Sequence, residues 1–68
     1  MVDTQYLEKK IKESGLKKVY LAEKCGCTRQ YFGMKLRNAA DFRVEDVKVL
    51  SRELKLTGKE ILKIFFSL

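Results

Sequence analysis

The sequence lacks histidine, tryptophan and proline, and its only two cysteines are Cys25 and Cys27. Zinc sites take about four ligands, mostly from Cys and His, and catalysis by a Ser–His–Asp or Cys–His arrangement needs a histidine. A glycine-rich phosphate-binding loop is missing too. We therefore expect a protein that is not an enzyme and that has no cofactor, no metal and no small-molecule substrate.

Long apolar runs are also missing. The longest stretches, such as ILKIFF near the C-terminus, fall well short of the roughly 18 to 20 residues that cross a bilayer, and no targeting segment is recognisable. Two cysteines are too few for the disulfide framework of a small secreted chain. We therefore expect an intracellular, cytoplasmic protein with no membrane partner.

The charge of this short chain has one dominant sign. By size, residues 1–68 form one small domain, and fifteen Lys and Arg against nine Asp and Glu give a formal net charge of +6. A basic surface attracts polyanions. The alternative is that the net charge only reflects lysines on solvated helix faces. The placement favours polyanion binding, because residues 28–43 contain four basic residues and one acid, whereas residues 44–60 contain four of each.

Apolar residues recur at helical spacing along the chain, and the alternation typical of a strand is not sustained anywhere. The pattern predicts a compact all-α fold of five helices. Their expected ranges are about 4–13, 17–25, 29–37, 44–54 and from 57 to near the C-terminus. The inward-facing stripe of the fourth helix is predicted at Val44, Val47, Leu50 and Leu54.

Short polar residues mark where these helices begin. Asp3 or Thr4 suits the N-cap of the first helix, and Thr28 suits the N-cap of the third. Thr57 and Glu60 have the spacing of a capping box, in which each side chain accepts a backbone N–H of the other residue. These signals fix the predicted boundaries more closely than hydropathy does.

The segment between the second and third helices has the residue types of a helix-turn-helix unit. Ala22 is small enough for two helices to cross closely, and Gly26 tolerates the positive φ that the turn needs. Cys27 is expected to turn inward after the glycine, and Phe32 to anchor the third helix in the core. All four requirements are met at the right spacing.

These residues carry a family resemblance. The segment KVYLAEKCGCTRQYF resembles the lambda-repressor-like (XRE-type) helix-turn-helix family, which reads approximately Q-x-x-L-A-x-x-x-G-h-S-x-x-x-h, where h is apolar. The matching positions are Leu21, Ala22, Gly26, Cys27, Thr28 and Phe32. Further along, MKLRNAADF, VEDVKVLSREL and EILKIFF are similar to small phage-associated repressors of that family, so the resemblance covers nearly the whole chain.

The chain departs from the family pattern at four places. Lys18 replaces the usual glutamine and still offers a phosphate donor. Cys25 and Cys27 replace larger apolar residues; as small hydrophobes they suit the core, and a redox sensor or a metal ligand is the alternative role. Arg43 stands where a Ser or Thr cap is common, which either loosens the start of the fourth helix or leaves Arg43 for DNA.

The resemblance implies a sequence-specific transcriptional regulator of double-stranded DNA, in particular a phage-type repressor that binds a two-fold operator as a homodimer. Its third helix, about 28–37, would enter the major groove. The residues expected to read bases are Thr28, Arg29, Gln30, Gly33 and Met34. The residues expected to contact phosphates are Lys17, Lys18, Tyr31, Lys35, Arg37, Asn38 and Arg43.

Two of the residues expected to read bases suit a particular base, and a third, Gly33, is unusual for the exposed face of a helix. Arg29 suits a bidentate pair with guanine, and Gln30 suits adenine. Gly33 weakens the exposed face of the helix by about 1 kcal/mol relative to alanine. Either this glycine allows the backbone to approach DNA closely, or it reflects simple drift.

Four apolar residues in the second half of the sequence have predicted roles in packing or in contacts with a partner. Phe42 is expected to cover the core from the loop before the fourth helix, and Phe65 to pack inward. Phe66, with Leu68, is the candidate dimer contact. The alternative function is an interaction module that keeps the helix-turn-helix scaffold and binds a repressor or polymerase subunit. It predicts an exposed apolar patch around Phe65, Phe66 and Leu68. RNA binding is less favoured, since the aromatic platform of RNA-binding sheets is missing.

Overall fold

The computed structural model describes residues 1–67, and in this range the chain forms five helices and no strand. The helices are α1 (Thr4–Ser14), α2 (Lys18–Lys24), α3 (Arg29–Leu36), α4 (Val44–Glu53) and α5 (Gly58–Phe65). The all-α prediction is confirmed, and every predicted helix boundary lies within one residue of the observed one. No helix among the described residues is long and apolar enough to cross a bilayer.

The predicted caps form. The side chains of Asp3, Thr28 and Thr57 each accept the backbone N–H of the residue three positions later, at 3.1, 3.0 and 3.2 Å. Glu60 returns a bond by accepting the N–H of Thr57 at 2.9 Å, which completes the capping box. Three of the five helix starts are therefore set by residues that lie next to them in the sequence.

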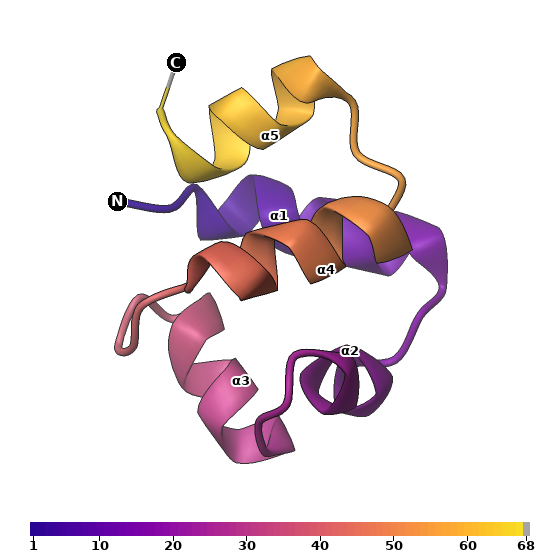
Figure 1. The fold of residues 1–68 in the computed structure, drawn as a ribbon, viewed down its shortest axis with the longest axis vertical. Helices are drawn as coiled ribbons and strands as arrows, with labels where there is room; N and C mark the ends of the chain where they lie inside the picture. Colours follow the sequence, from indigo (N-terminus) through magenta and orange to yellow (C-terminus); the bar gives the residue numbers. More distant parts are fainter. Residues whose placement is uncertain (68) are drawn as a thin grey trace.

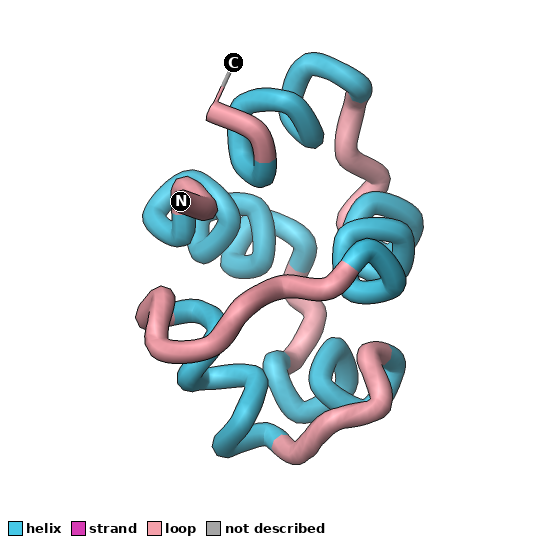
Figure 2. Tube along the Cα trace, turned by 60° about the vertical axis from the view of Figure 1, so that its left-hand side comes forward, coloured by secondary structure: helices cyan, strands magenta, loops and turns pink. Residues whose placement is uncertain are grey.

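The helices are stacked along the longest axis of the molecule, which measures 28 × 24 × 19 Å. In Figure 1, α5 lies at one end, α1 and α4 lie in the middle, and α2 and α3 lie at the other end. Figure 2 shows that the chain between α3 and α4 is an extended segment that crosses one side of the molecule. The α2–α3 pair is consequently at the opposite end from α5.

One hydrophobic core connects all five helices. It is made of Leu7, Ile11, Leu21, Ala22, Cys25, Phe32, Leu36, Leu50, Leu54 and Ile64. Phe42 covers this core from the loop, as predicted, and its ring contacts the ring of Phe65 edge-on with 5.6 Å between centroids. The predicted inward packing of Phe65 is therefore also confirmed.

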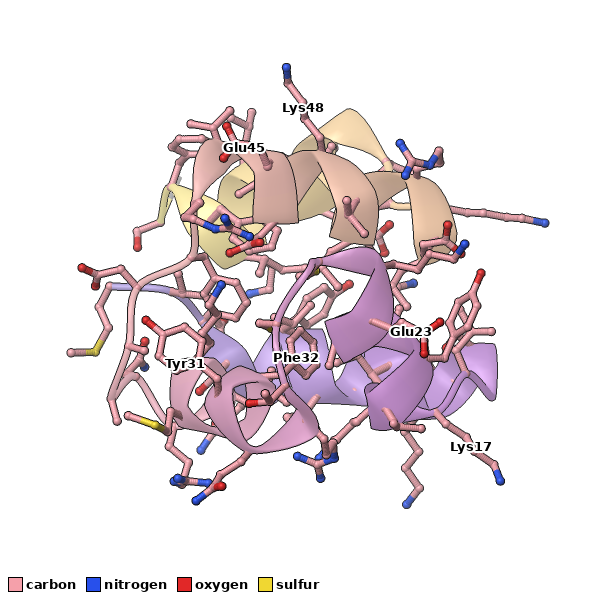
Figure 3. The ribbon with its side chains drawn as sticks, turned by 60° about the horizontal axis from the view of Figure 1, so that its bottom comes forward. Lys17, Glu23, Tyr31, Phe32, Glu45 and Lys48 are labelled. Atoms are coloured by element: carbon pink, nitrogen blue, oxygen red, sulfur yellow. The ribbon has the colours of Figure 1, made fainter. Side chains whose placement is uncertain are left out.

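The predicted stripe of α4 is partly wrong. Val44 is 67% exposed, whereas Asp46 is completely buried. Leu50 and Leu54, four and eight residues after Asp46, complete the buried face. Hydropathy could not predict this arrangement, because a carboxylate is buried only when partners from other elements surround it. Figure 3 shows Glu45 and Lys48 on the outer side of this helix.

Candidate nucleic-acid interface

The connection between α2 and α3 is a tight turn held by backbone hydrogen bonds. Gly26 has φ +73°, as its predicted role requires. The N–H of Cys27 donates to the carbonyl of Ala22 at 3.0 Å. Ala22 and Phe32 are both buried, and Figure 3 shows the ring of Phe32 in the interior beside α3. The turn therefore fixes the two helices against one core and leaves the outer face of α3 in solvent.

The positive charge of the chain is concentrated on this helix pair. Residues 17–37 contain six Lys or Arg and one acid, Glu23, whereas the rest of the chain contains nine basic and eight acidic residues. Two of the six basic residues are neutralised, Lys18 by Glu8 at 2.9 Å and Lys35 by Asp46. The other four, which have no carboxylate within 4.0 Å among residues 1–67, are Lys17, Lys24, Arg29 and Arg37. Their charges are available to an anionic partner.

The residues expected to read bases lie on α3 and at its start. Arg29 and Gln30 are exposed, and Met34 is half-buried. The hydroxyl oxygen of Thr28 accepts the N–H of Tyr31, so its hydroxyl proton remains free to donate. Gly33 lies inside the helix with its backbone covered. A polar edge that donates hydrogen bonds therefore runs from the N-terminus of α3 along its outer face.

A methyl group added at Gly33 would meet two arginines. An ideal Cβ at this position lies 3.1 Å from Nη1 of Arg29 and 3.3 Å from Nη1 of Arg37. These residues are four positions before and four positions after the glycine, so all three share one face of the helix. Both guanidinium groups consequently lie over the same short stretch of backbone, at the buried Gly33.

The structure contradicts the predicted phosphate contact at Lys35. Its side chain is 1% exposed, and its ammonium pairs with Asp46 and lies 5.3 Å from the centre of the Tyr31 ring. Position 35 faces α4, where the buried carboxylate of Asp46 compensates the charge. Lys35 therefore holds α3 against α4 and is not available to DNA.

Asp46 is the residue that the sequence prediction missed. Its carboxylate accepts the backbone N–H of Arg43 at 2.9 Å and the guanidinium of Arg43 at 2.8 Å, in addition to the ammonium of Lys35. Burial would raise the pKa of Asp46, but the hydrogen bonds from Arg43 and Lys35 outweigh it and the pKa is lowered. An acid three residues after an N-cap that lacks a capping side chain is the signal that could have indicated this role.

Arg43 links this carboxylate to the end of α2. Its Nη2 donates to the carbonyl oxygen of Cys25 at 2.7 Å as well as to Asp46. The start of α4 is therefore not loosened by the absence of a Ser or Thr cap. The Arg43 side chain remains 54% exposed, so its phosphate contact stays a prediction.

The structure brings several predicted residues together around one groove. The groove has a volume of about 510 Å³ and is lined by Gly26, Cys27, Thr28, Tyr31, Lys35 and Arg43. Figure 3 shows Tyr31 projecting from α3 and Lys17 extending away from the start of α2 on another side. The predicted phosphate contacts thus flank the exposed face of α3 and do not form a single cluster.

Three further predicted contacts have different surroundings. Arg37 and Asn38 are exposed at the end of α3, and the Asn38 side chain donates to the carbonyl of Val2 at 3.3 Å. Lys18 is half-buried and paired with Glu8. Its charge is already compensated, so Lys18 is a weaker phosphate ligand than the unpaired Lys17.

Both cysteines pack with the core. Cys25 is buried and Cys27 is half-buried against the same cluster. Burial, with a smaller contribution from the charge of Asp46, raises the pKa of Cys25 to about 11. A protonated, buried thiol is a poor nucleophile and a poor metal ligand. Within residues 1–67, no group of three or more His, Cys, Asp or Glu is arranged to hold a metal ion.

The candidate dimer contact lies at the end of α5. Phe66 is 58% exposed, and Leu62, one turn earlier, is 44% exposed. Leu68, the other predicted contact, lies outside the described residues. Leu62 was not part of the predicted contact; the spacing of four between Leu62 and Phe66, which places them on one face of the helix, is the signal that could have found it.

Comparisons of the chain with protein-family profiles, curated proteins and solved structures find no significant match. A function for this chain is therefore inferred from its own residues and their geometry.

Proposed function

We propose that the chain is a sequence-specific double-stranded DNA-binding protein of lambda-repressor-like helix-turn-helix type, acting as a phage-type transcriptional repressor. The arrangement of α2 and α3 supports this proposal, because Ala22, Gly26 and Phe32 occupy the close crossing, the turn and the core anchor that such a unit needs. In this unit the second helix, here α3, lies in the major groove and its N-terminal residues contact base edges.

One observation carries the proposal: the exposed face of α3 is lined by cations without acidic partners. Arg29 and Arg37 lie on this face, and Lys17, the residue before α2, and Lys24, its last residue, are likewise unpaired within residues 1–67. Surface arginine and lysine normally lie among acids of opposite sign. A surface with one sign of charge favours a polyanion and releases its counterions on binding, which gives a strong dependence of affinity on salt.

The residues along α3 divide into two roles. Arg29 suits guanine O6 and N7, and Gln30 suits adenine N6 and N7, so these two side chains supply sequence specificity. Tyr31 and Arg43 line the groove beside α3, and Lys17 lies just before α2. These three side chains would contact phosphates, which position the helix without reading sequence. The protein would repress transcription by occupying a promoter.

A homodimer on a two-fold operator follows from the same proposal. Leu62 and Phe66 offer an apolar contact, and α5 lies at the opposite end of the molecule from α2 and α3. A contact through these residues would leave the α3 face open. Half-sites would then be spaced by about one turn of DNA, 34–36 Å between centres.

The test starts with selection of bound duplexes from a random pool, followed by gel-shift titrations of the selected and random duplexes at several salt concentrations. We expect a palindromic consensus and tight binding that weakens steeply with salt. The variant Arg29→Ala, Gln30→Ala should lose preference for the consensus. The variant Lys48→Ala, which removes an exposed cation from α4, should keep it. Unchanged preference in the double variant would show that α3 does not read the bases.

The second candidate function is an interaction module that binds a repressor or polymerase subunit. The exposure of Leu62 and Phe66 on one face of α5 favours it. This function predicts only weak DNA binding, with equal affinity for selected and random duplexes. The same titrations therefore separate the two functions, and Phe66→Ala would then abolish partner binding without changing DNA binding.

A further inference from the structure

Gly33 has no conformational reason to be a glycine. It lies inside α3, and its φ is outside the positive region that favours glycine. The positive-φ glycines are Gly15 and Gly26. A glycine in the interior of a helix costs about 1 kcal/mol relative to alanine. Stability therefore favours alanine at this position, and another requirement must favour glycine.

The side chains around Gly33 indicate that requirement. The space of a Cβ is bounded by Nη1 of Arg29 at 3.1 Å and Nη1 of Arg37 at 3.3 Å. Neither arginine has a carboxylate within 4.0 Å among the described residues. Two like charges that converge without a counter-charge repel each other. The arrangement does not help the isolated protein to fold, and it is the arrangement that an electronegative ligand would stabilise.

We propose that Gly33 is a specificity-determining residue, because it seats Arg29 and Arg37 side by side so that the two guanidinium groups read neighbouring guanines in the major groove. This inference rests on the proposed function. Guanine presents two acceptors, O6 and N7, toward the major groove, and an arginine guanidinium matches them with two parallel donors. Glycine acts here by making room for side chains, in contrast to the expectation that it lets the protein backbone approach DNA closely.

A phosphate group shares the acceptor chemistry of guanine, so the position of the pair matters. The guanidinium groups meet over the middle of the outer face of α3, and the residues placed to reach phosphates lie on either side of that face. A helix in the major groove points its outer face at base edges and its sides at the phosphate backbones. Guanine is therefore the expected ligand.

The first experiment compares Gly33→Ala with Gly58→Ala. Gly58 lies at the start of α5 with nothing within 4 Å of an added Cβ, so its substitution is a matched control. Gly33→Ala should keep or raise the thermal midpoint and lower affinity for the selected duplex at least about tenfold, in line with the loss of one bidentate contact. Gly58→Ala should leave affinity unchanged. Unchanged affinity in Gly33→Ala would overturn the inference.

A double-mutant cycle tests whether the glycine acts through the arginines. In an Arg29→Ala, Arg37→Ala background, Gly33→Ala should produce no further loss of affinity, because no guanidinium remains to be displaced. An equal loss in both backgrounds would mean that the methyl group blocks DNA directly. That result would restore the idea of close backbone approach.

The second experiment distinguishes guanine from phosphate. Each guanine of the selected duplex is replaced by 7-deazaguanine, which lacks the N7 acceptor. At two neighbouring positions we expect the wild-type protein to lose about as much affinity as Arg29→Ala or Arg37→Ala does. If no position has an effect, and each arginine variant lowers the salt slope by about 1, the ligand is phosphate and the inference is wrong. If the wild-type protein selects no duplex at all, the proposed function itself fails.

Discussion

The two ends of the molecule use their charges differently. At the α1–α5 end, Lys10 lies 2.9 Å from Glu60, and Lys63 lies 3.9 Å from Asp3. The hydroxyl of Tyr6 also donates to Glu60 at 3.3 Å. Cations and carboxylates from opposite ends of the sequence are matched here, so these charges connect the first helix to the last.

At the α2–α3 end, the exposed cations have no such partners in the described part of the chain. Residues 17–37 contain a single acid, Glu23, and the one cation that faces inward from α3, Lys35, pairs with Asp46. The paired cation on α3 is buried and the unpaired ones are in solvent. The comparison indicates that the matched charges contribute to the fold, and the unmatched charges are those that the proposed DNA binding would use.

The largest effect is expected from the buried pair. Asp46→Ala leaves the Lys35 ammonium buried without a partner and removes three hydrogen bonds from Arg43. Breaking a buried pair in this way costs about 3–5 kcal/mol, which urea denaturation measures as the free energy of unfolding. Asp41→Ala, at an exposed acid outside any ion pair, is the control and should have almost no effect.

A second substitution distinguishes the loss of the Lys35–Asp46 ion pair from a loss of packing at position 46. Lys35→Met in the Asp46→Ala background removes the uncompensated charge and should recover part of the stability. Equal losses in Asp46→Ala and Asp41→Ala would mean that α3 and α4 are held together by the apolar core alone.

An intermediate effect is expected from removing one lysine at either end. Lys17→Ala should weaken binding to selected and random duplexes alike and lower the salt slope by about 1, without changing the thermal midpoint. Lys10→Ala should lower the thermal midpoint slightly and leave DNA affinity unchanged, because its charge is already matched by Glu60. Gel shifts and thermal denaturation of both variants give the two readouts. If Lys10→Ala weakened DNA binding and Lys17→Ala lowered the thermal midpoint, the proposed difference between the two ends would be wrong.

The smallest effect is expected from the pH dependence of the α1–α5 end. The hydrogen bond from the Thr57 N–H, together with that from Lys10, lowers the pKa of Glu60 from 4.5 to about 2. A lowered folded-state pKa stabilises the fold above the unfolded-state value, and this contribution is lost as the pH falls from about 4.5 to 2. Glu60→Gln should therefore have a lower thermal midpoint than wild type at neutral pH.

The measurement is a series of thermal denaturations from pH 7 to pH 2. The difference between wild type and Glu60→Gln should shrink through this acidic window. DNA affinity at neutral pH should be the same for both proteins, since Glu60 lies at the end opposite α3. A constant difference at every pH would show that the Glu60 carboxylate does not stabilise the fold through its charge.

Local sequence signals predicted much of the fold. The caps at Thr28 and Thr57 and the positive φ at Gly26 each depend on residues within about four positions, so the sequence contains all of the interacting groups. The burial of Phe32 was predicted because it is a large apolar side chain four residues after the N-cap Thr28, where a helix-turn-helix unit needs an inward-facing anchor. Once Phe32 fixes the buried face of α3, the opposite face must be exposed, and this located the candidate surface.

Two features of the candidate site were not predictable in this way. Lys35 was assigned to phosphate because it belongs to the basic stretch over residues 28–43, whereas its partner Asp46 lies on the next helix. Val44 was assigned to the core because valine is apolar, although the first turn of α4 points it into solvent. Both errors concern which side chain of a helix faces a neighbouring helix, and that depends on how the helices pack.

The sequence by itself determined five helices, their boundaries, the glycine turn and the excess of positive charge over residues 17–37, because these properties arise from neighbouring residues or from composition. Only the tertiary structure decided which charges are neutralised. Lys35 and Asp46 are eleven residues apart and on different helices, and they pair because the core brings α3 against α4. The same packing leaves Arg29 and Arg37 without a carboxylate within 4.0 Å among residues 1–67. Which of the charges on α3 remain unpaired is therefore decided by how the helices pack.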